Sequence, residues 1–206
     1  MRTMKANPGY LLILAMLTAP LAHGDGVADL LAKAESGDVA AQLELSGIYA
    51  KGEGVTKDAA AAVKWLTKAA EQGNAEAQLK LGGVYIGGRG VPKNSTEAAK
   101  WITLSANQGN AAAQCQLGRM HLTGAGVPKD DVDAYKWANL AATQGDPAAK
   151  KVLAFLIVRM TPEQIKDGKQ RSQDFLDLKN AADKPMDLPG DSGAAPVESL
   201  PLLVPE

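Results

Sequence analysis

The sequence predicts an all-α protein, a superhelical solenoid of antiparallel helix pairs with three full repeats and capping helices. One observation is a six-residue segment, G-x-G-V-x-K, that recurs every 36 residues, at 52–57, 88–93 and 124–129. A second is that three 36-residue units align without a gap and are identical at thirteen positions, when written as 39–74, 75–110 and 111–146. A third is the lack of long alternating Val/Ile runs, which a sheet would need. A fixed period of this size is typical of stacked helical repeats.

The first 24 residues have the features of a secretory signal peptide. Two basic residues near the start precede an apolar run at 11–22, and Ala22 and Gly24 form a small-x-small cleavage site. The run is too short to span a membrane stably. We therefore expect a mature chain of residues 25–206, periplasmic or secreted and without an integral membrane segment. Losing the two basic residues changes the formal charge from −1 to −3, so no nucleic-acid partner is expected.

The segment 26–37 resembles the second half of a unit. Gly37 is in phase with Gly73, which ends the first full unit's second helix. Asp29 stands where the units carry a tryptophan. This segment is therefore expected to be a capping helix that faces solvent at the start of the array.

Each full unit reads as two helices, and the second unit shows why. Asn74 is a favourable N-cap, and the apolar positions that follow have helical spacing. Gly88 and Gly90 end this first helix and turn the chain. Asn94 with Glu97 three residues later predicts a capping box for the second helix. Its buried side is expected to be Ala98, Trp101 and Ala106, and Gly109 stops it.

The glycine loop GRGVPK, residues 88–93, also invites a phosphate-binding interpretation. A P-loop needs G-x-x-x-x-G-K-[ST], whose backbone N–H groups surround the phosphates. Here Pro92 removes one donor, and neither Ser nor Thr follows Lys93. We therefore interpret the loop as the turn within a helix pair, with Val91 pointing inward.

The carboxyl-terminal part is expected to hold capping helices over 147–178. Asp146 with Pro147 gives an N-cap and a first helical position. The run 152–158 is apolar nearly all round, so we expect it to be well buried, and a further helix is expected to begin near residue 161. Five prolines fall after residue 178 without a helical period, which predicts a disordered tail over 179–206.

The repeated pattern resembles the Sel-one-like repeat, a relative of the tetratricopeptide repeat. The residues that carry the resemblance in the second unit are Ala77-Gln78, Leu81-Gly82-x-x-Tyr85, Gly88-x-Gly90-Val91, Asn94, Ala98-x-x-Trp101 and Gly109. Ser46 and His121 depart from the pattern in the neighbouring units. The resemblance implies a right-handed superhelix and a protein-interaction scaffold, often in bacterial envelopes.

The resemblance also implies a concave face lined by the first helix of each unit. By that analogy the partner-binding residues are Leu43, Leu79, Ile86, Cys115, Arg119 and Leu122, with Gly47, Ala50 and Gly83 beside them. The alternative is that neighbouring helices cover these positions. An extended or helical segment of another protein would occupy such a groove, with Arg119 contacting a carboxylate. Lys64, Lys100 and Lys136 form a second repeated row, which is either a solvated face or a site for an acidic partner.

Catalytic and metal-binding patterns are weak. His121 is the single histidine after the signal peptide, and it occupies the position of Tyr49 and Tyr85, which favours a packing role. Cys115 is the single cysteine and replaces a leucine, so it is either a small apolar substitute or a thiol facing the groove. No cofactor, metal or small-molecule substrate is expected. The alternatives to an adaptor are a β-lactamase-like hydrolase or penicillin binder, and a secreted effector that binds a host protein.

Overall fold

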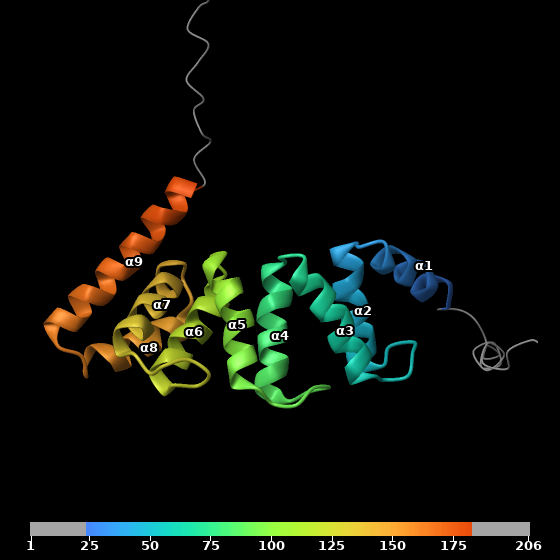
Figure 1. Ribbon diagram of the computed structural model, residues 1–206, viewed down its shortest axis with the longest axis horizontal. Coiled ribbons are helices and arrows are strands. Elements are labelled where there is room, and N and C mark those ends of the chain that lie inside the picture. The colour runs from blue at the N-terminus through green and yellow to red at the C-terminus, as the bar shows by residue number, and fades with distance from the viewer. Residues whose placement is uncertain (1–23, 183–206) are drawn as a thin grey trace, which may run out of the picture.

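The computed structural model describes residues 24–182, and every regular element within that range is a helix (Figure 1). The helices are α1 (Gly24–Glu35), α2 (Val39–Lys51), α3 (Ala59–Glu71), α4 (Ala75–Gly87), α5 (Ser95–Asn107), α6 (Ala111–Thr123), α7 (Asp131–Thr143), α8 (Pro147–Ile157) and α9 (Pro162–Ala182). The predicted all-α fold is therefore confirmed. The signal-peptide prediction, apart from Gly24, and most of the predicted tail lie outside the described residues.

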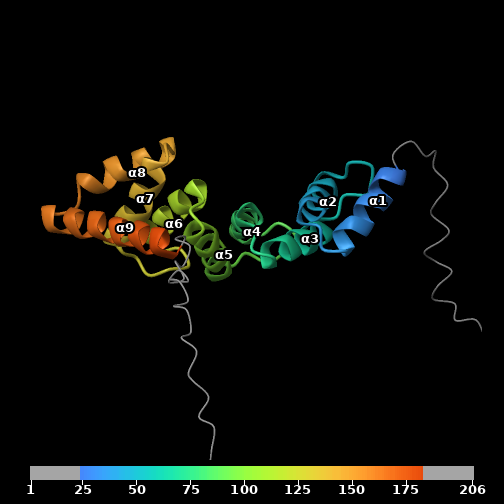
Figure 2. The ribbon, with the colours of Figure 1, turned by 90° about the horizontal axis from the view of Figure 1, so that it is seen from above.

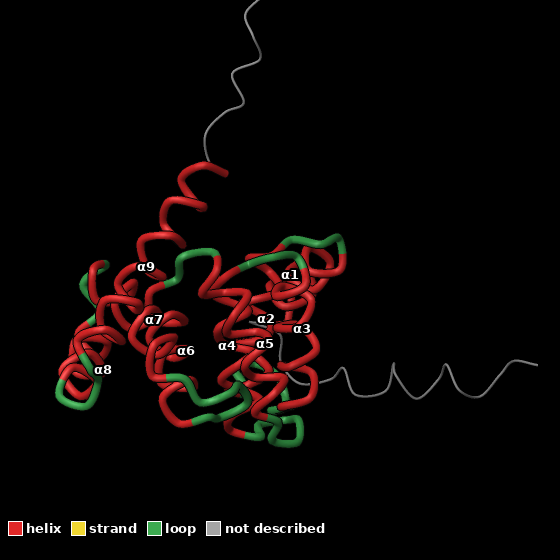
Figure 3. Tube along the Cα trace, turned by 60° about the vertical axis from the view of Figure 1, so that its left-hand side comes forward, coloured by secondary structure: helices red, strands yellow, loops and turns green. Residues whose placement is uncertain are grey.

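The helices stack as pairs, each helix packing on the next along the chain from α1 to α8. Seen from above, the stack forms a shallow arc, with α2, α4, α6 and α8 along its inner side (Figure 2). The second helices α3 and α5 lie on the outer side, and at the far end α7 lies between α8 and α9 (Figure 2). Loops are confined to the ends of the helices (Figure 3). We call the inner side of this arc the concave face.

Side-chain caps start the helices where the sequence predicts them. At the first helix of each unit, and again at α8, a carboxylate or amide oxygen accepts the backbone N–H three residues on, at 2.8–3.0 Å: Asp38, Asn74, Asn110 and Asp146. Asn94 caps α5 through the N–H of Glu97 at 3.0 Å. The carboxylate of Glu97 pairs with Lys100 instead of returning to the cap, so the predicted capping box is only half formed.

The glycine loops do what the turn interpretation requires. Gly88 ends α4 in the left-handed region at φ 67°, and its N–H donates to the carbonyl of Val84. A Cβ on Gly90 would lie 2.5 Å from the carbonyl oxygen of Ala59, which belongs to the preceding unit. The loop is therefore a turn that also packs one unit on the next, and Val91 is partly buried against the core as expected.

The core is built from small and aliphatic side chains. Leu45, Leu81 and Leu117 occupy equivalent positions and are at most 1% exposed. Trp65 and Trp137 are each 6% exposed, whereas Trp101 is only partly buried. The expectation that Trp101 fills the interior is therefore too strong. The outer tryptophans are covered by the end helices, and the middle one is not.

The last helix, α9, covers the carboxyl-terminal end of the array. α9 packs on α7 and continues to Ala182, past the expected boundary at 178. The ring of Phe175 meets Trp137 edge-on at 5.3 Å between centroids. The ammonium of Lys179 donates to the carbonyl of Gln108 at 2.7 Å, so α9 reaches back past the third unit to the second.

The prediction that 152–158 is well buried is wrong. Leu156 is fully buried, but Phe155, Ile157 and Val158 are 48%, 49% and 86% exposed. The physical reason is the position of α9, which lies across α7 and leaves one side of α8 uncovered. An apolar helix at the end of a stack is buried only where a neighbour is present.

Candidate binding surface

A cleft of about 640 Å³ opens where α2, α3 and α4 meet, and we call it the repeat 1–2 cleft. Its floor is apolar and comes from all three helices, with Leu43, Val63, Leu66 and Val84 as the larger side chains. Gly47, Ala50 and Gly83 line it with small residues that leave the space open. Three exposed cations, Lys57, Lys80 and Arg89, also line the cleft, and we call them its rim.

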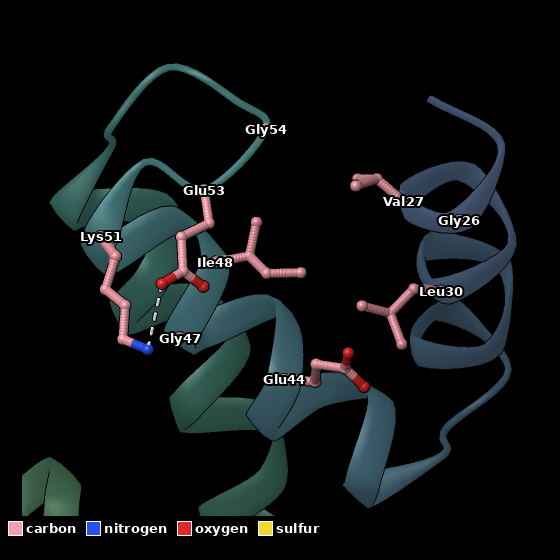
Figure 4. A pocket seen from close by; sticks show the side chains of 9 residues that line it. All are labelled: Gly26, Val27, Leu30, Glu44, Gly47, Ile48, Lys51, Glu53 and Gly54. Atoms are coloured by element: carbon pink, nitrogen blue, oxygen red, sulfur yellow. Dashed lines mark ion pairs between the residues drawn. The ribbon is translucent and has the colours of Figure 1, made fainter. Parts of the chain in front are cut away.

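A second hollow, of about 800 Å³, lies between α1 and α2. Val27 and Leu30 of α1 face Ile48 of α2 across it (Figure 4). Lys51 and Glu53 form an ion pair at 3.2 Å beside it, and Glu44 adds a second carboxylate to its lining. Figure 4 shows the hollow between a capping helix and the first unit, with Glu44, Lys51 and Glu53 as its charged side chains.

The predicted concave-face residues separate into groups. Leu43 lines the repeat 1–2 cleft, as do its companions Gly47, Ala50 and Gly83. Leu79 is half-buried against a core cluster, and Leu122 is half-buried against another that contains Tyr135 and Leu156. Ile86 is 40% exposed, and Arg119 is exposed. The row therefore holds some residues that face solvent and others that support the core.

Cys115 does not join this surface. It is 5% exposed and packs against Ala141 and Ala149, on the side of α6 that meets α7 and α8. Burial raises the pKa of its thiol to about 11, and the nearby carboxylate of Asp146 contributes to the rise. The thiol is therefore protonated at neutral pH and acts as a small apolar group rather than a reactive one.

Two exposed residues extend the predicted concave-face row and were not among the residues expected from the sequence. Phe155 and Val158 stand 36 residues after Arg119 and Leu122, so α8 continues the concave face for one further unit. The guanidinium of Arg159 lies 4.9 Å from the centre of the Phe155 ring. The signal was the 36-residue period itself, which extends one helix past the last full repeat.

The lysine row does not form one surface. Lys100 pairs with Glu97, and Lys136 lies over the rings of Trp137 and Phe175 at 4.5 and 5.3 Å. Burial lowers the pKa of Lys136. α9 therefore covers one member of the row, and a second is already paired.

His121 contacts the backbone of its own glycine loop. Nδ1 of the half-buried His121 lies 3.2 Å from the carbonyl oxygen of Pro128, a contact that ties α6 to its glycine loop. Among residues 24–182, no three His, Cys, Asp or Glu side chains gather where they could hold a metal ion. No helix in the same range is long and apolar enough to cross a membrane.

The fold and the concave face define this protein as an α-solenoid of tetratricopeptide-like helix pairs. A family model for the Sel1 repeat matches residues 39–74, 75–110 and 111–146, the same three units that the sequence period marks. The chain belongs to the Sel1 repeat family, whose members are generally protein–protein interaction scaffolds.

Several solved structures are similar to this chain, among them the three that follow. A Sel1 repeat protein from Oxalobacter formigenes is 44% identical, with 63% of this chain and 97% of that chain covered and a TM-score of 0.59. The protective antigen c5321 of uropathogenic Escherichia coli, which displays an SLR fold, is 26% identical with a TM-score of 0.49, covering 92% of this chain and 48% of that one. Helicobacter pylori cysteine rich protein B is 24% identical with a TM-score of 0.48, covering 64% and 99%. No curated protein matches the chain.

Proposed function

We propose that this protein is an exported scaffold of the bacterial envelope that binds a segment of a partner protein along its concave face. The observation that carries the proposal is the row of side chains at equivalent positions of successive units, Ala50, Ile86, Leu122 and Val158, in which Ile86 and Val158 are 40% and 86% exposed. A rigid helix-pair array presents such a row without any conformational change, which lowers the cost of binding.

Export is the second part of the proposal and rests on the sequence before Asp25. The expected mature protein begins at Asp25, which amino-terminal sequencing of the protein from a fractionated culture would check. Recovery from the periplasm supports an envelope adaptor, and recovery from the medium supports an effector that acts outside the cell. An intact amino terminus in the cytoplasm would contradict export.

The binding face is tested by in-cell crosslinking and capture of the tagged protein. The test variant is Ile86→Asp/Val158→Asp, because both side chains face solvent and their replacement leaves the core intact. Leu79 and Leu122 are less suitable because both also support core clusters. A partner captured by the wild type and lost by the variant supports the proposal.

The matched control is Leu178→Asp on α9, at a side chain that is 73% exposed and belongs to no first helix of a unit. Circular dichroism should give the same helicity for all three proteins. A partner that the concave-face variant still captures would place binding elsewhere on the molecule.

A further inference from the structure

The repeat 1–2 cleft combines an apolar floor with an unbalanced positive rim. None of the residues that line it is acidic. Lys80 is paired with Glu76 at 2.6 Å, but within residues 24–182 no carboxylate lies within 4.0 Å of Lys57 or Arg89. Two cations are therefore available to a ligand, one from the glycine loop of each of two successive units.

This charge is a property of one cleft and is not required by the fold. Moving 36 residues along the chain replaces the three rim cations by Lys93, Gln116 and Ala125, and another 36 residues gives Lys129, Val152 and Thr161. The first cation recurs in every unit, whereas the other two occur only at the first junction. A repeat that had to be cationic for stability would carry all three each time.

The chain itself contains a segment of complementary chemistry. Residues 183–206, outside the described part, carry five acidic residues and one lysine, a formal charge of −4. Within them the run ESLPLLVPE, 198–206, places four aliphatic residues between two glutamates. An apolar run flanked by carboxylates matches an apolar floor flanked by cations.

The chain between α9 and residue 198 is long enough for residues 198–206 to reach the repeat 1–2 cleft. α9 ends near the second unit, because Lys179 contacts the carbonyl of Gln108, whose side chain in turn contacts Gln78 at the start of α4. The cleft lies toward the other end of α4, a helix of 13 residues and therefore about 20 Å long. The fifteen residues 183–197 span up to about 50 Å when extended, enough to pass around the stack.

We propose that residues 198–206 bind in the repeat 1–2 cleft of their own chain. Glu198 and Glu206 pair with the rim cations, and the aliphatic residues cover the floor. Tethering gives the segment a local concentration in the millimolar range, so a weak interaction suffices to occupy the cleft. If the proposed function holds, a partner that binds the concave face at the repeat 1–2 cleft has to displace this segment.

The test uses the purified full chain with Leu202 replaced by the photo-crosslinking residue p-benzoylphenylalanine. After irradiation, mass spectrometry maps the crosslinked peptides. The expected result is a monomeric product joined to peptides of α2, α3 or α4. Crosslinks only to other surfaces, crosslinks only between two chains, or no crosslink at all would overturn the proposal.

Charge reversal provides the matched control. Lys57→Glu/Arg89→Glu should reduce the crosslink yield at least tenfold, whereas Lys93→Glu/Lys129→Glu, at the positions equivalent to Lys57 in the next two units, should leave it unchanged. Free peptide ESLPLLVPE in excess should compete with the crosslink, and raised salt should weaken it. Equal loss in both charge variants would show nonspecific attraction and reject the site.

This outcome is independent of partner capture. If the crosslink is absent while capture still depends on Ile86 and Val158, the tail proposal fails and the scaffold stands. If the crosslink forms while capture ignores the concave face, the proposed function fails and the tail site stands.

Discussion

The side-chain amide of Gln108 donates to the side-chain oxygen of Gln78 at 2.7 Å, joining the end of one unit to its beginning. Gln78 in turn donates to the carbonyl of Ala70 in the preceding unit at 3.1 Å. The same bond recurs in the other two units, between Gln72 and Gln42 and between Gln144 and Gln114. Repeated every 36 residues, these amides form a ladder that ties each helix pair to the one before it.

Replacing one glutamine of this ladder should lower the stability of the folded array. Gln78 is 4% exposed, and Gln78→Leu removes both its bond to the carbonyl of Ala70, which keeps the N–H of Gly73, and the bond that it accepts from Gln108. We expect a loss of about 1–3 kcal/mol in the free energy of unfolding, measured by urea denaturation. Lys150→Leu is the matched control, since Lys150 holds the equivalent position in α8 but is exposed. Equal losses in the two variants would mean that the ladder contributes nothing.

The three tryptophans should differ in their contribution to stability. Trp137→Ala removes a 6% exposed ring that contacts Phe175, with an expected cost of about 3–5 kcal/mol. Trp101→Ala should cost clearly less, because that ring is only partly buried. Thermal and urea unfolding of both variants checks the order. A larger loss for Trp101→Ala would contradict this account of the packing.

Two adjacent glycines of α4 should respond in opposite directions to the same substitution. A Cβ on Gly82 would lie 2.4 Å from Cγ1 of Ile102 and 3.1 Å from the carbonyl oxygen of Ala98, so Gly82→Ala should destabilise by about 1–3 kcal/mol. A Cβ on Gly83 meets no atom within 4 Å, and Gly83→Ala should stabilise by about 0.5–1 kcal/mol. Similar shifts in the melting temperatures of the two variants would refute this helix contact.

The thiol of Cys115 should make stability depend on alkaline pH. Its pKa is raised from 9.0 to about 11 in the folded chain, so the unfolded chain loses this proton first. Stability from this group is present below pH 9 and falls as the pH rises from about 9 to 11. Wild type should therefore lose stability relative to Cys115→Ala across that window. In the native state at about pH 8, a thiol reagent should label Cys115 far more slowly than in urea.

The sequence predicts well what depends on near neighbours along the chain. The caps at Asn74 and Asn94 and the turn at Gly88 are local, so their residue types reveal them. The sequence did not reveal which residues of the expected concave-face row are exposed, because burial depends on which helix comes to lie alongside. Cys115 and Ile86 come from equivalent inner helices, yet one meets α7 and α8 while the other meets solvent.

Features at the junctions of distant segments were not predictable. The path of α9 across α7 leaves Phe155 of α8 exposed and covers Trp137 of α7. The sequences of α7 and α8 alone do not predict either result. The rim of the repeat 1–2 cleft unites Lys57 and Arg89 from two loops, 32 positions apart. Only the packing of three helices brings them to one opening.

The contacts between α9 and the third unit, which we call the seat of α9, restrict how this array of repeats can evolve. Gly168 of α9 lies against the ring of Tyr135, and Arg171 pairs with Asp133 at 2.8 Å. The equivalent positions hold Val63 and Ala61 in the first unit and Ala99 and Glu97 in the second. A duplication that inserted a copy of the first or second unit after residue 146 would separate α9 from its seat. Whole repeats can therefore be inserted before residue 111 without breaking the contacts between α7 and α9. The third unit and α9 have to be kept together.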